Sequence, residues 1–169
     1  NSYGLSHDEG KALLGKIAIK NHHNGSLTPK AMLRNEITLE QYNKAPIIAW
    51  PLGLFDSCGV TDGAAAAIIC RADLAKKIRP DPIKIKSIQI CTTGYHGLID
   101  PEYDFTHIKG TILAVKAAFA EAQVTDPRKE ISLANVHDCF TITELVIYED
   151  LGFSPKGRAK DDIEAGSFT

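Results

Sequence analysis

The segment Asn135–Phe153, read as NVHDCFTITELVIYEDLGF, decides the predicted fold of this chain. An apolar run typical of a strand, Ile131 to Val136, leads into it, and an amphipathic helix is predicted from Thr141 to Leu151, with Gly152 at its end. His137 is therefore predicted at a strand end directly before a helix, which is where α/β folds place their ligands. A histidine there could donate an N–H to an oxyanion, or it could merely cap the helix or bond a carbonyl.

The other periodic segments predict an α/β layer. Residues 83–90 (IKIKSIQI) alternate apolar and polar side chains, as a strand with one wet face does. Ser6 and Glu9 have the capping-box spacing, so a helix is predicted from there to Asn24-Gly25. Further helices are predicted over residues 38–43, 72–78 and 111–122, and a brief helix with a buried strand over residues 64–70. The order strand, helix, strand, helix from Ile83 to Gly152 predicts helices packed against a mostly parallel sheet.

The composition is that of a globular chain without a basic surface. The chain has 169 residues, 44% of them hydrophobic, and a formal net charge of −2, which argues against direct nucleic-acid binding. Its longest apolar stretch, Ala64 to Cys70, is far shorter than the ~20 residues that span a bilayer, and no signal peptide opens the chain. We therefore expect no membrane association and a cytoplasmic location. Because the chain begins with Asn1 rather than Met, we expect a piece of a longer polypeptide.

The four cysteines have no CxxC spacing and are expected to be free thiols in a reducing compartment. Cys139 lies at a predicted helix N-terminus, where a thiol ionises more readily, so it is either a nucleophile or a packed turn residue. Cys58, in a Gly-rich turn, either lines a pocket or packs against its neighbours. Cys70 and Cys91 are expected to be buried small hydrophobes.

Several other polar residues have simple structural interpretations. Asp138 and Thr141 are interpreted as helix-cap acceptors. His22-His23 have no carboxylate or cysteine at a ligand spacing, so we expect a solvated helix end and no metal site. Tyr95-His96 and His107 fall in predicted loops that could reach the same rim as His137.

Three segments of the chain resemble the thiolase superfamily in the right order. Residues 18–31 (AIKNHHNGSLTPKA) are similar to a loop-domain helix and its exit. Residues 51–66 (PLGLFDSCGVTDGAAA) are similar to the Asp-Gly-Ala-Ala-Ala signature that returns the chain from the loop domain. The His-Asp-Cys-Phe at residues 137–140 is similar to the branch of sterol-carrier-protein-type and archaeal thiolases, in which it replaces Asn-Glu-Ala-Phe. The order and spacing of the three make the match specific.

The resemblance implies an α/β fold, the thiolase-like layered α-β-α-β-α architecture, of which this chain holds only part. Residues 1–52 would be the end of the loop domain and residues 53–79 the last part of the N-terminal thiolase half. Residues 80–169 would be an incomplete C-terminal thiolase half.

The resemblance also implies coenzyme A thioester chemistry. In such enzymes one Cys takes up the acyl group, the His of a Gly-His-Pro motif activates that Cys, and a second Cys moves a proton. We expect all three residues outside this chain, which contains no Gly-His-Pro. His137 matches a residue of the oxyanion hole, Phe140 an aromatic residue bordering the acyl pocket, and Cys58 a position near the pantetheine arm. The resemblance implies no metal and no bound cofactor, with the coenzyme A thioester as substrate.

The parent enzyme would be an acetyl-CoA acetyltransferase or 3-ketoacyl-CoA thiolase-like acyltransferase of lipid metabolism. It would make or cleave 3-ketoacyl-CoA by Claisen-type chemistry through an acyl-Cys intermediate, and the isolated piece is expected to be inactive. Its partners would be acyl-CoA and 3-ketoacyl-CoA, and likeness implies a homo-oligomer. Two alternatives stay open: a thiolase-like subunit that performs retro-aldol cleavage or acyl transfer with a small partner protein, and a non-catalytic lipid-carrier or scaffold component.

Overall fold

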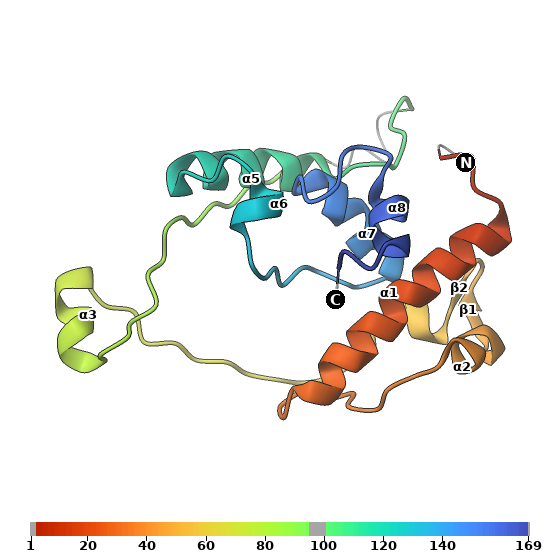
Figure 1. The fold of residues 1–169 in the computed structure, drawn as a ribbon, viewed down its shortest axis with the longest axis horizontal. Coiled ribbons are helices and arrows are strands. Elements are labelled where there is room, and N and C mark those ends of the chain that lie inside the picture. The colour runs from red at the N-terminus through yellow and green to blue at the C-terminus, as the bar shows by residue number, and fades with distance from the viewer. Residues whose placement is uncertain (1–2, 95–100, 169) are drawn as a thin grey trace.

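The computed structural model describes residues 3–94 and 101–168. Its central element is the long helix α1 (His7–Leu27) (Figure 1). The predicted capping box starts this helix. Ser6 Oγ accepts a hydrogen bond from Glu9 N at 3.3 Å, and the Glu9 carboxylate accepts one from Ser6 N at 2.8 Å. The helix continues to Leu27, beyond the predicted stop at Asn24-Gly25.

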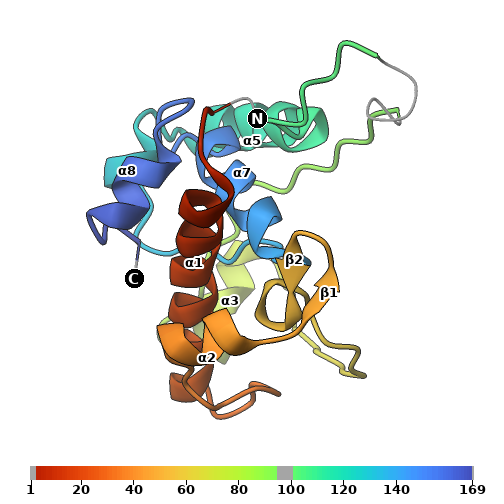
Figure 2. The same cartoon turned by 90° about the vertical axis from the view of Figure 1, so that its right-hand side faces the viewer.

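Two hydrophobic clusters form the core, and α1 contributes to both. The helices α2 (Leu39–Lys44), α7 (Thr141–Asp150) and α8 (Ala159–Glu164) supply the other members, apart from Ile37, which lies just before α2. The clusters consist of Ile17, Tyr148 and Ala159, and of Ala18, Ile37 and Tyr42. Successive residues of a helix point about 100° apart, so Ile17 and Ala18 face different neighbours. Figure 2 shows the consequence, with α8 on one side of α1 and the β-hairpin on the other.

The remaining elements are short, except for α5. An antiparallel hairpin of β1 (Ile47–Ala49) and β2 (Leu52–Gly53), with a cis Trp50–Pro51 bond, runs into the 3-10 helix η1 (Leu54–Asp56). The predicted helices are confirmed as α2, α3 (Ala72–Ile78), α5 (Lys109–Ala122) and α7. Gly152 follows α7 with φ at +75°, which agrees with its predicted role as a helix terminator. The hairpin, α6 (Pro127–Glu130) and α8 are absent from the sequence-based prediction.

The predicted parallel sheet does not form in the described residues. Residues 83–90 and 131–136 and the segment 64–70 run without regular secondary structure, and the only sheet in residues 3–94 and 101–168 is the two-stranded hairpin. The prediction of helices packed against a mostly parallel sheet is therefore wrong for this structure, which is mostly helical. A strand depends on hydrogen bonds to a neighbouring strand, and the described residues place no such neighbour beside these segments.

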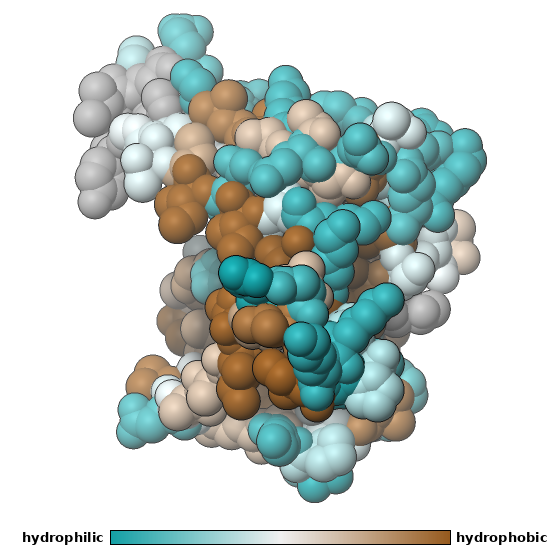
Figure 3. Space-filling view, turned by 90° about the vertical axis from the view of Figure 1, so that its left-hand side faces the viewer, coloured by the Kyte–Doolittle hydropathy of each residue, from teal (hydrophilic) through white to brown (hydrophobic). Residues whose placement is uncertain are grey.

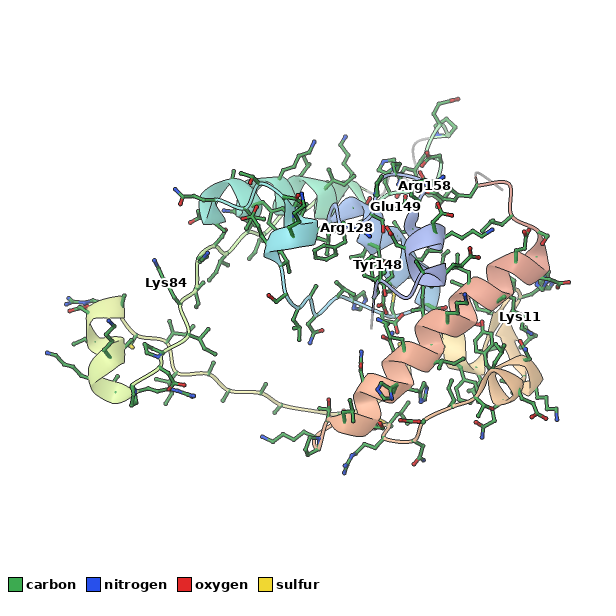
Figure 4. The ribbon with its side chains drawn as sticks, viewed as in Figure 1. Lys11, Lys84, Arg128, Tyr148, Glu149 and Arg158 are labelled. Carbon is green, nitrogen blue, oxygen red and sulfur yellow. The ribbon has the colours of Figure 1, made fainter. Side chains whose placement is uncertain are left out.

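The segment 83–90 lies along α5 by its polar side chains. Ser87 Oγ and Gln89 Nε2 each donate a hydrogen bond to Glu121 Oε2 on α5, both at 2.7 Å. Figure 4 shows Lys84 further back on this segment, between α3 and the rest of the molecule. In this segment, which has the alternating pattern of a strand, polar side chains contact the helix α5. The apolar side chains of the pattern stay exposed.

These unpaired segments carry several exposed apolar side chains. Figure 3 shows that hydrophobic side chains, in brown, lie at the surface on this side of the molecule. Ile83 is 92% exposed, Ile68 91%, Ile90 89% and Leu133 84%. Contiguous apolar surface of this kind marks places where other protein surface normally packs. In the described part of the chain, no helix has both the length and the apolar character needed to cross a bilayer.

Candidate functional site

Two segments that are far apart in the sequence meet at the start of α7. Ser57 and Phe140 form an isolated antiparallel β-bridge, and Cys58 N donates a hydrogen bond to Cys139 O at 3.1 Å. The turn that carries Cys58 is thereby joined to the His-Asp-Cys-Phe segment. Two of the three predicted site residues, Cys58 and Phe140, belong to this junction.

A buried carboxylate, Asp56, fixes the junction from behind. It is 3% exposed and accepts hydrogen bonds from Thr141 Oγ1 at 2.9 Å, Tyr42 OH at 2.7 Å and Gly53 N at 2.8 Å. The donors come from α7, α2 and the hairpin, so one side chain ties three elements together. Thr141 therefore donates to Asp56 and does not cap α7, which corrects its predicted role.

A cavity of about 310 Å³ opens beside the junction, and we refer to it as the Cys58 cavity. Its volume lies at the lower end of the range of small-molecule sites, roughly 300–1,000 Å³. Its walls come from α1, from the segment after α1 and from the two joined turns. The lining residues are Ala18, Asn21, His22, Met32, Leu33, Phe55, Asp56, Ser57, Cys58, Gly59, Thr61 and Asp138. The structure therefore places Cys58 where it lines a pocket, one of its two predicted roles.

Asp138 belongs to a network of polar side chains between α1 and α7. Asn21 Nδ2 donates to Asp138 Oδ2 at 2.8 Å and to Glu144 Oε2 at 2.5 Å. Glu144 is 2% exposed, forms an ion pair with Lys20 and accepts a hydrogen bond from the Tyr148 hydroxyl. Asp138 accepts from Asn21 and α7 has no side-chain cap, so the predicted helix-cap role of Asp138 is wrong.

Burial changes the pKa of two groups in this network, Asp138 and Tyr148. Burial raises the pKa of the Asp138 carboxyl above its usual range, and the negative charge of Glu144 raises it further, against the opposing hydrogen bond from Asn21. Burial and the hydrogen bond to Glu144 likewise raise the pKa of the Tyr148 hydroxyl. Asp138 Oδ1 is buried and has no hydrogen-bond partner in the described residues.

His137 and Phe140 lie on either side of Asp138 and Cys139, in the segment directly before α7. His137 is exposed and follows an extended segment that is not a strand, so its predicted position at a strand end is not observed. Within residues 3–94 and 101–168 no hydrogen bond to its ring is found. Phe140 is 41% exposed and stands immediately before α7. Neither residue is among the cavity-lining side chains, whereas Asp138, between them in sequence, is.

The remaining candidates divide into those near the junction and those far from it. Cys139 Sγ lies 3.3 Å from Thr143 Oγ1, and all four cysteines are free thiols. Cys70 is exposed and Cys91 partly exposed, so the prediction that both are buried is wrong. Both lie in segments without a strand partner.

His107 lies far from His137. His107 pairs with Asp104 at 3.1 Å, and the next residue, Ile108, donates its N–H to Asp150 at the far end of α7. A helix of ten residues is about 15 Å long, so His107 and His137 lie at opposite ends of α7. Tyr95-His96 lie outside the described residues.

At the end of α1, the two adjacent histidines have partners near in sequence. His22 Nδ1 lies 2.9 Å from Asn35 O, and His23 Nδ1 lies 2.8 Å from Glu36 Oε1. Across the described part of the chain, no group of three or more His, Cys, Asp or Glu side chains is arranged to hold a metal ion.

The sequence-based interpretation missed Asn21 and Glu144. Glu144 carried a signal, because it lies three residues after Thr141 and four before Tyr148, at helical spacing with residues that are buried. A charged residue at such a position needs a buried partner. The partner, Lys20 with Asn21, comes from a helix 124 residues away and could not be identified from spacing.

A second hollow, of about 630 Å³, lies at the N-terminal half of α1 and has mostly apolar walls. Trp50 and Phe105 line it, with Lys11 and Arg158 among its charged residues (Figure 4). None of His137, Phe140 and Cys58 contributes to it.

Comparisons with known proteins agree on one family. Residues 92–169 match the family described as thiolase C-terminal domain-like. The chain is 35% identical to an acetyl-CoA acetyltransferase of Methanothermobacter thermautotrophicus, over 97% of this chain and 41% of that protein. It is 30% identical to the 17-hydroxy-3-oxo-4-pregnene-20-carboxyl-CoA lyase of Mycobacterium tuberculosis, over 90% of this chain and 40% of that protein.

A solved structure is also similar to this chain. The Ltp2-ChsH2(DUF35) aldolase superposes with a TM-score of 0.75 at 25% sequence identity, over 98% of this chain and 42% of that chain. The chain therefore spans about two fifths of the length of these relatives.

Proposed function

We propose that this chain, which belongs to the thiolase superfamily, is part of an acyltransferase that acts on coenzyme A thioesters. The parent enzyme makes or cleaves 3-ketoacyl-CoA by Claisen-type chemistry. Residues 1–52 are the end of its loop domain, residues 53–79 the last part of its N-terminal half, and residues 80–169 an incomplete C-terminal half. The acyl-accepting cysteine and the Gly-His-Pro histidine belong to other parts of the parent, so the isolated chain is inactive.

The observation that carries this proposal is the junction of the Cys58 turn with the His-Asp-Cys-Phe segment beside a cavity. Making or breaking a carbon–carbon bond next to a thioester passes through an enolate, whose negative oxygen needs hydrogen-bond donors. His137 supplies such a donor at the rim. Phe140 borders the acyl group, and Cys58 borders the pantetheine arm of the coenzyme A ester.

The test is turnover of acetoacetyl-CoA by the full-length protein with and without His137→Ala. We expect at least a tenfold loss of turnover, or ~1.4 kcal/mol of transition-state stabilisation, because an oxyanion donor is removed. His23→Ala is the matched control, since His23 is also exposed but pairs with Glu36 at the end of α1. Equal turnover of His137→Ala and wild type rules out the oxyanion role.

The names of two similar proteins favour a second candidate function. The similar solved structure is an aldolase with two named components, and another relative, from Thauera aromatica, is a benzoylsuccinyl-CoA thiolase subunit, 29% identical over 92% of this chain. In this alternative the parent is a subunit that cleaves a carbon–carbon bond by a retro-aldol route and needs a small partner protein. Purification of the full-length protein from its natural source distinguishes the two. Turnover of acetoacetyl-CoA without a second component favours the acyltransferase.

A further inference from the structure

We propose that Asn21 of α1 is a positioning residue for His137. Its side-chain amide fastens the segment before α7 to the core, and this fixes where the His137 ring stands next to the Cys58 cavity. The inference rests on the proposed function, because Asn21 acts only through the oxyanion donor assigned there. Sequence spacing gives no sign of it, since Asn21 and its partner Asp138 are 117 residues apart in the chain.

The amide of Asn21 is itself held in place. Its Nδ2 donates one hydrogen to Glu144 Oε2 at 2.5 Å and the other to Asp138 Oδ2 at 2.8 Å. Glu144 is 2% exposed and is fixed in turn by an ion pair with Lys20 and a hydrogen bond from the Tyr148 hydroxyl. A planar amide with one hydrogen on a fixed carboxylate directs its second hydrogen along one line. Asn21 therefore joins Asp138 to the buried network between α1 and α7.

Asn21 has no N–H left for a ligand, although it lines the Cys58 cavity. Both hydrogens of its amide are donated within the protein, to Asp138 and Glu144. A side chain in this state orients its neighbours and supplies no new hydrogen-bond donor to a bound molecule. Its removal should therefore affect the chemical step more than the binding of the substrate.

The segment that Asn21 holds has few other attachments. Residues 132–138 have no regular secondary structure, and in the described part of the chain the bond from Asn21 is the only hydrogen bond that reaches them. The next attachment along the chain is at Cys139, whose carbonyl accepts a backbone hydrogen bond from the opposite turn at 3.1 Å. With the Asn21 bond, the fixed point is the residue directly after His137. Without it, the dihedral angles of Asp138 are free as well.

The ring of His137 depends on this backbone for its position. It is exposed and makes no hydrogen bond within residues 3–94 and 101–168. An oxyanion donor is effective only at about 2.7–3.1 Å from the oxygen that becomes charged, and a misplacement of about 1 Å can cost roughly 100-fold in rate. A bond that fixes the residue next to His137 should therefore raise kcat and leave substrate binding nearly unchanged.

The test is turnover of acetoacetyl-CoA by the full-length protein, with kcat and KM measured separately for wild type, Asn21→Ala and Asn24→Ala. We expect the kcat of Asn21→Ala to fall about tenfold and its KM to change by less than about twofold, because the donor acts on the transition state. Asn24→Ala is the matched control, since Asn24 is exposed on the same helix and should keep the wild-type kcat.

A double-mutant cycle with His137→Ala separates positioning from a general effect on folding. If Asn21 acts through His137, its removal should change kcat by less than about twofold once residue 137 is already alanine. A loss caused by a weakened fold would instead multiply with the loss caused by His137→Ala. Equal losses from Asn21→Ala in the two backgrounds would overturn the inference.

A second variant removes the same bond from its other end, in case Asn21→Ala does not fold. Asp138→Ala removes the acceptor, and with it a buried carboxylate oxygen that has no partner in the described residues, so the fold should tolerate this change. We expect the same fall in kcat of about tenfold, with no further loss when Asn21→Ala is added. A wild-type kcat in Asp138→Ala contradicts the inference.

The outcomes separate the inference from the proposed function. If His137→Ala lowers turnover and Asn21→Ala does not, the inference is wrong while the function stands. If His137→Ala leaves turnover unchanged, the oxyanion role and the inference fail together. If the wild type itself does not turn over acetoacetyl-CoA, the proposed function and the inference are both rejected.

Discussion

At the scale of single residues, Asp56 shows how one side chain can organise a site. It lies 85 residues before Thr141, yet it accepts hydrogen bonds from Thr141, Tyr42 and the backbone of Gly53. Burial raises the pKa of the Tyr42 hydroxyl, which keeps it a donor to Asp56. The carboxylate thus holds the Cys58 turn against the start of α7 through three hydrogen bonds.

Asp56→Ala should destabilise the chain by about 3 kcal/mol, because it leaves buried donors without an acceptor. The free energy of unfolding in urea measures this effect. Asp62→Ala is the matched control, since Asp62 is exposed a few residues further along the same segment and should change the stability by less than about 0.5 kcal/mol. Similar values for the two variants would show that Asp56 does not hold the junction.

At the scale of elements, α8 is attached to α6 by a charged contact. Arg128 of α6 donates to the Asp162 carboxylate of α8 at 2.7 and 2.8 Å, and Ser154 Oγ donates to the same carboxylate at 2.6 Å. The hydrogen bonds from Arg128 lower the pKa of Asp162 to about 2. Both helices are short, so they depend on such contacts rather than on their intrinsic helix stability.

The depressed pKa of Asp162 predicts a pH dependence with a definite sign. Its contribution to stability is complete above the pKa of the unfolded chain and is lost as pH falls toward about 2. Asp162→Asn should therefore lower the Tm near neutral pH and should reduce the Tm loss on acidification below about pH 4. Because the Arg128 side chain is 46% exposed, solvent screens the pair and the effect should be modest. Superimposable acid profiles of variant and wild type would contradict it.

At the scale of the whole molecule, the fold divides into a core around α1 and extended segments with exposed apolar side chains. Ile17 on α1 is 1% exposed, whereas Ile83 is 92% exposed. The same residue type thus has opposite surroundings in the two parts. The core holds the junction and the Cys58 cavity, and the extended segments connect α3 to it (Figure 1).

This contrast predicts different costs for the same substitution in this chain. Ile17→Ala should cost about 2–5 kcal/mol of unfolding free energy, because it leaves a cavity in the core. Ile83→Ala should change the stability by less than about 0.5 kcal/mol, since the side chain packs against little. Urea unfolding of both variants is the measurement. A large loss for Ile83→Ala would mean that this segment is packed in solution.

Local signals in the sequence were sufficient for the helices and for the family. Ser6 and Glu9 start α1, Gly152 follows α7, and the periodic apolar residues of α5 and α7 mark helices, because a helix satisfies its backbone within one segment. The order of the turn around Cys58 and the His-Asp-Cys-Phe segment along the chain also indicated the thiolase superfamily.

Only the tertiary structure decided the strands and the site. A strand requires a neighbour, and residues 83–90 have the strand pattern without a strand beside them in the described part of the chain. Glu144 of α7 pairs with Lys20 of α1, and Asp138, in the segment before α7, accepts a hydrogen bond from Asn21 of α1. These contacts join residues more than 100 positions apart in the chain. The protonation of a carboxyl depends on which groups surround it, and those neighbours are set by packing rather than by sequence spacing.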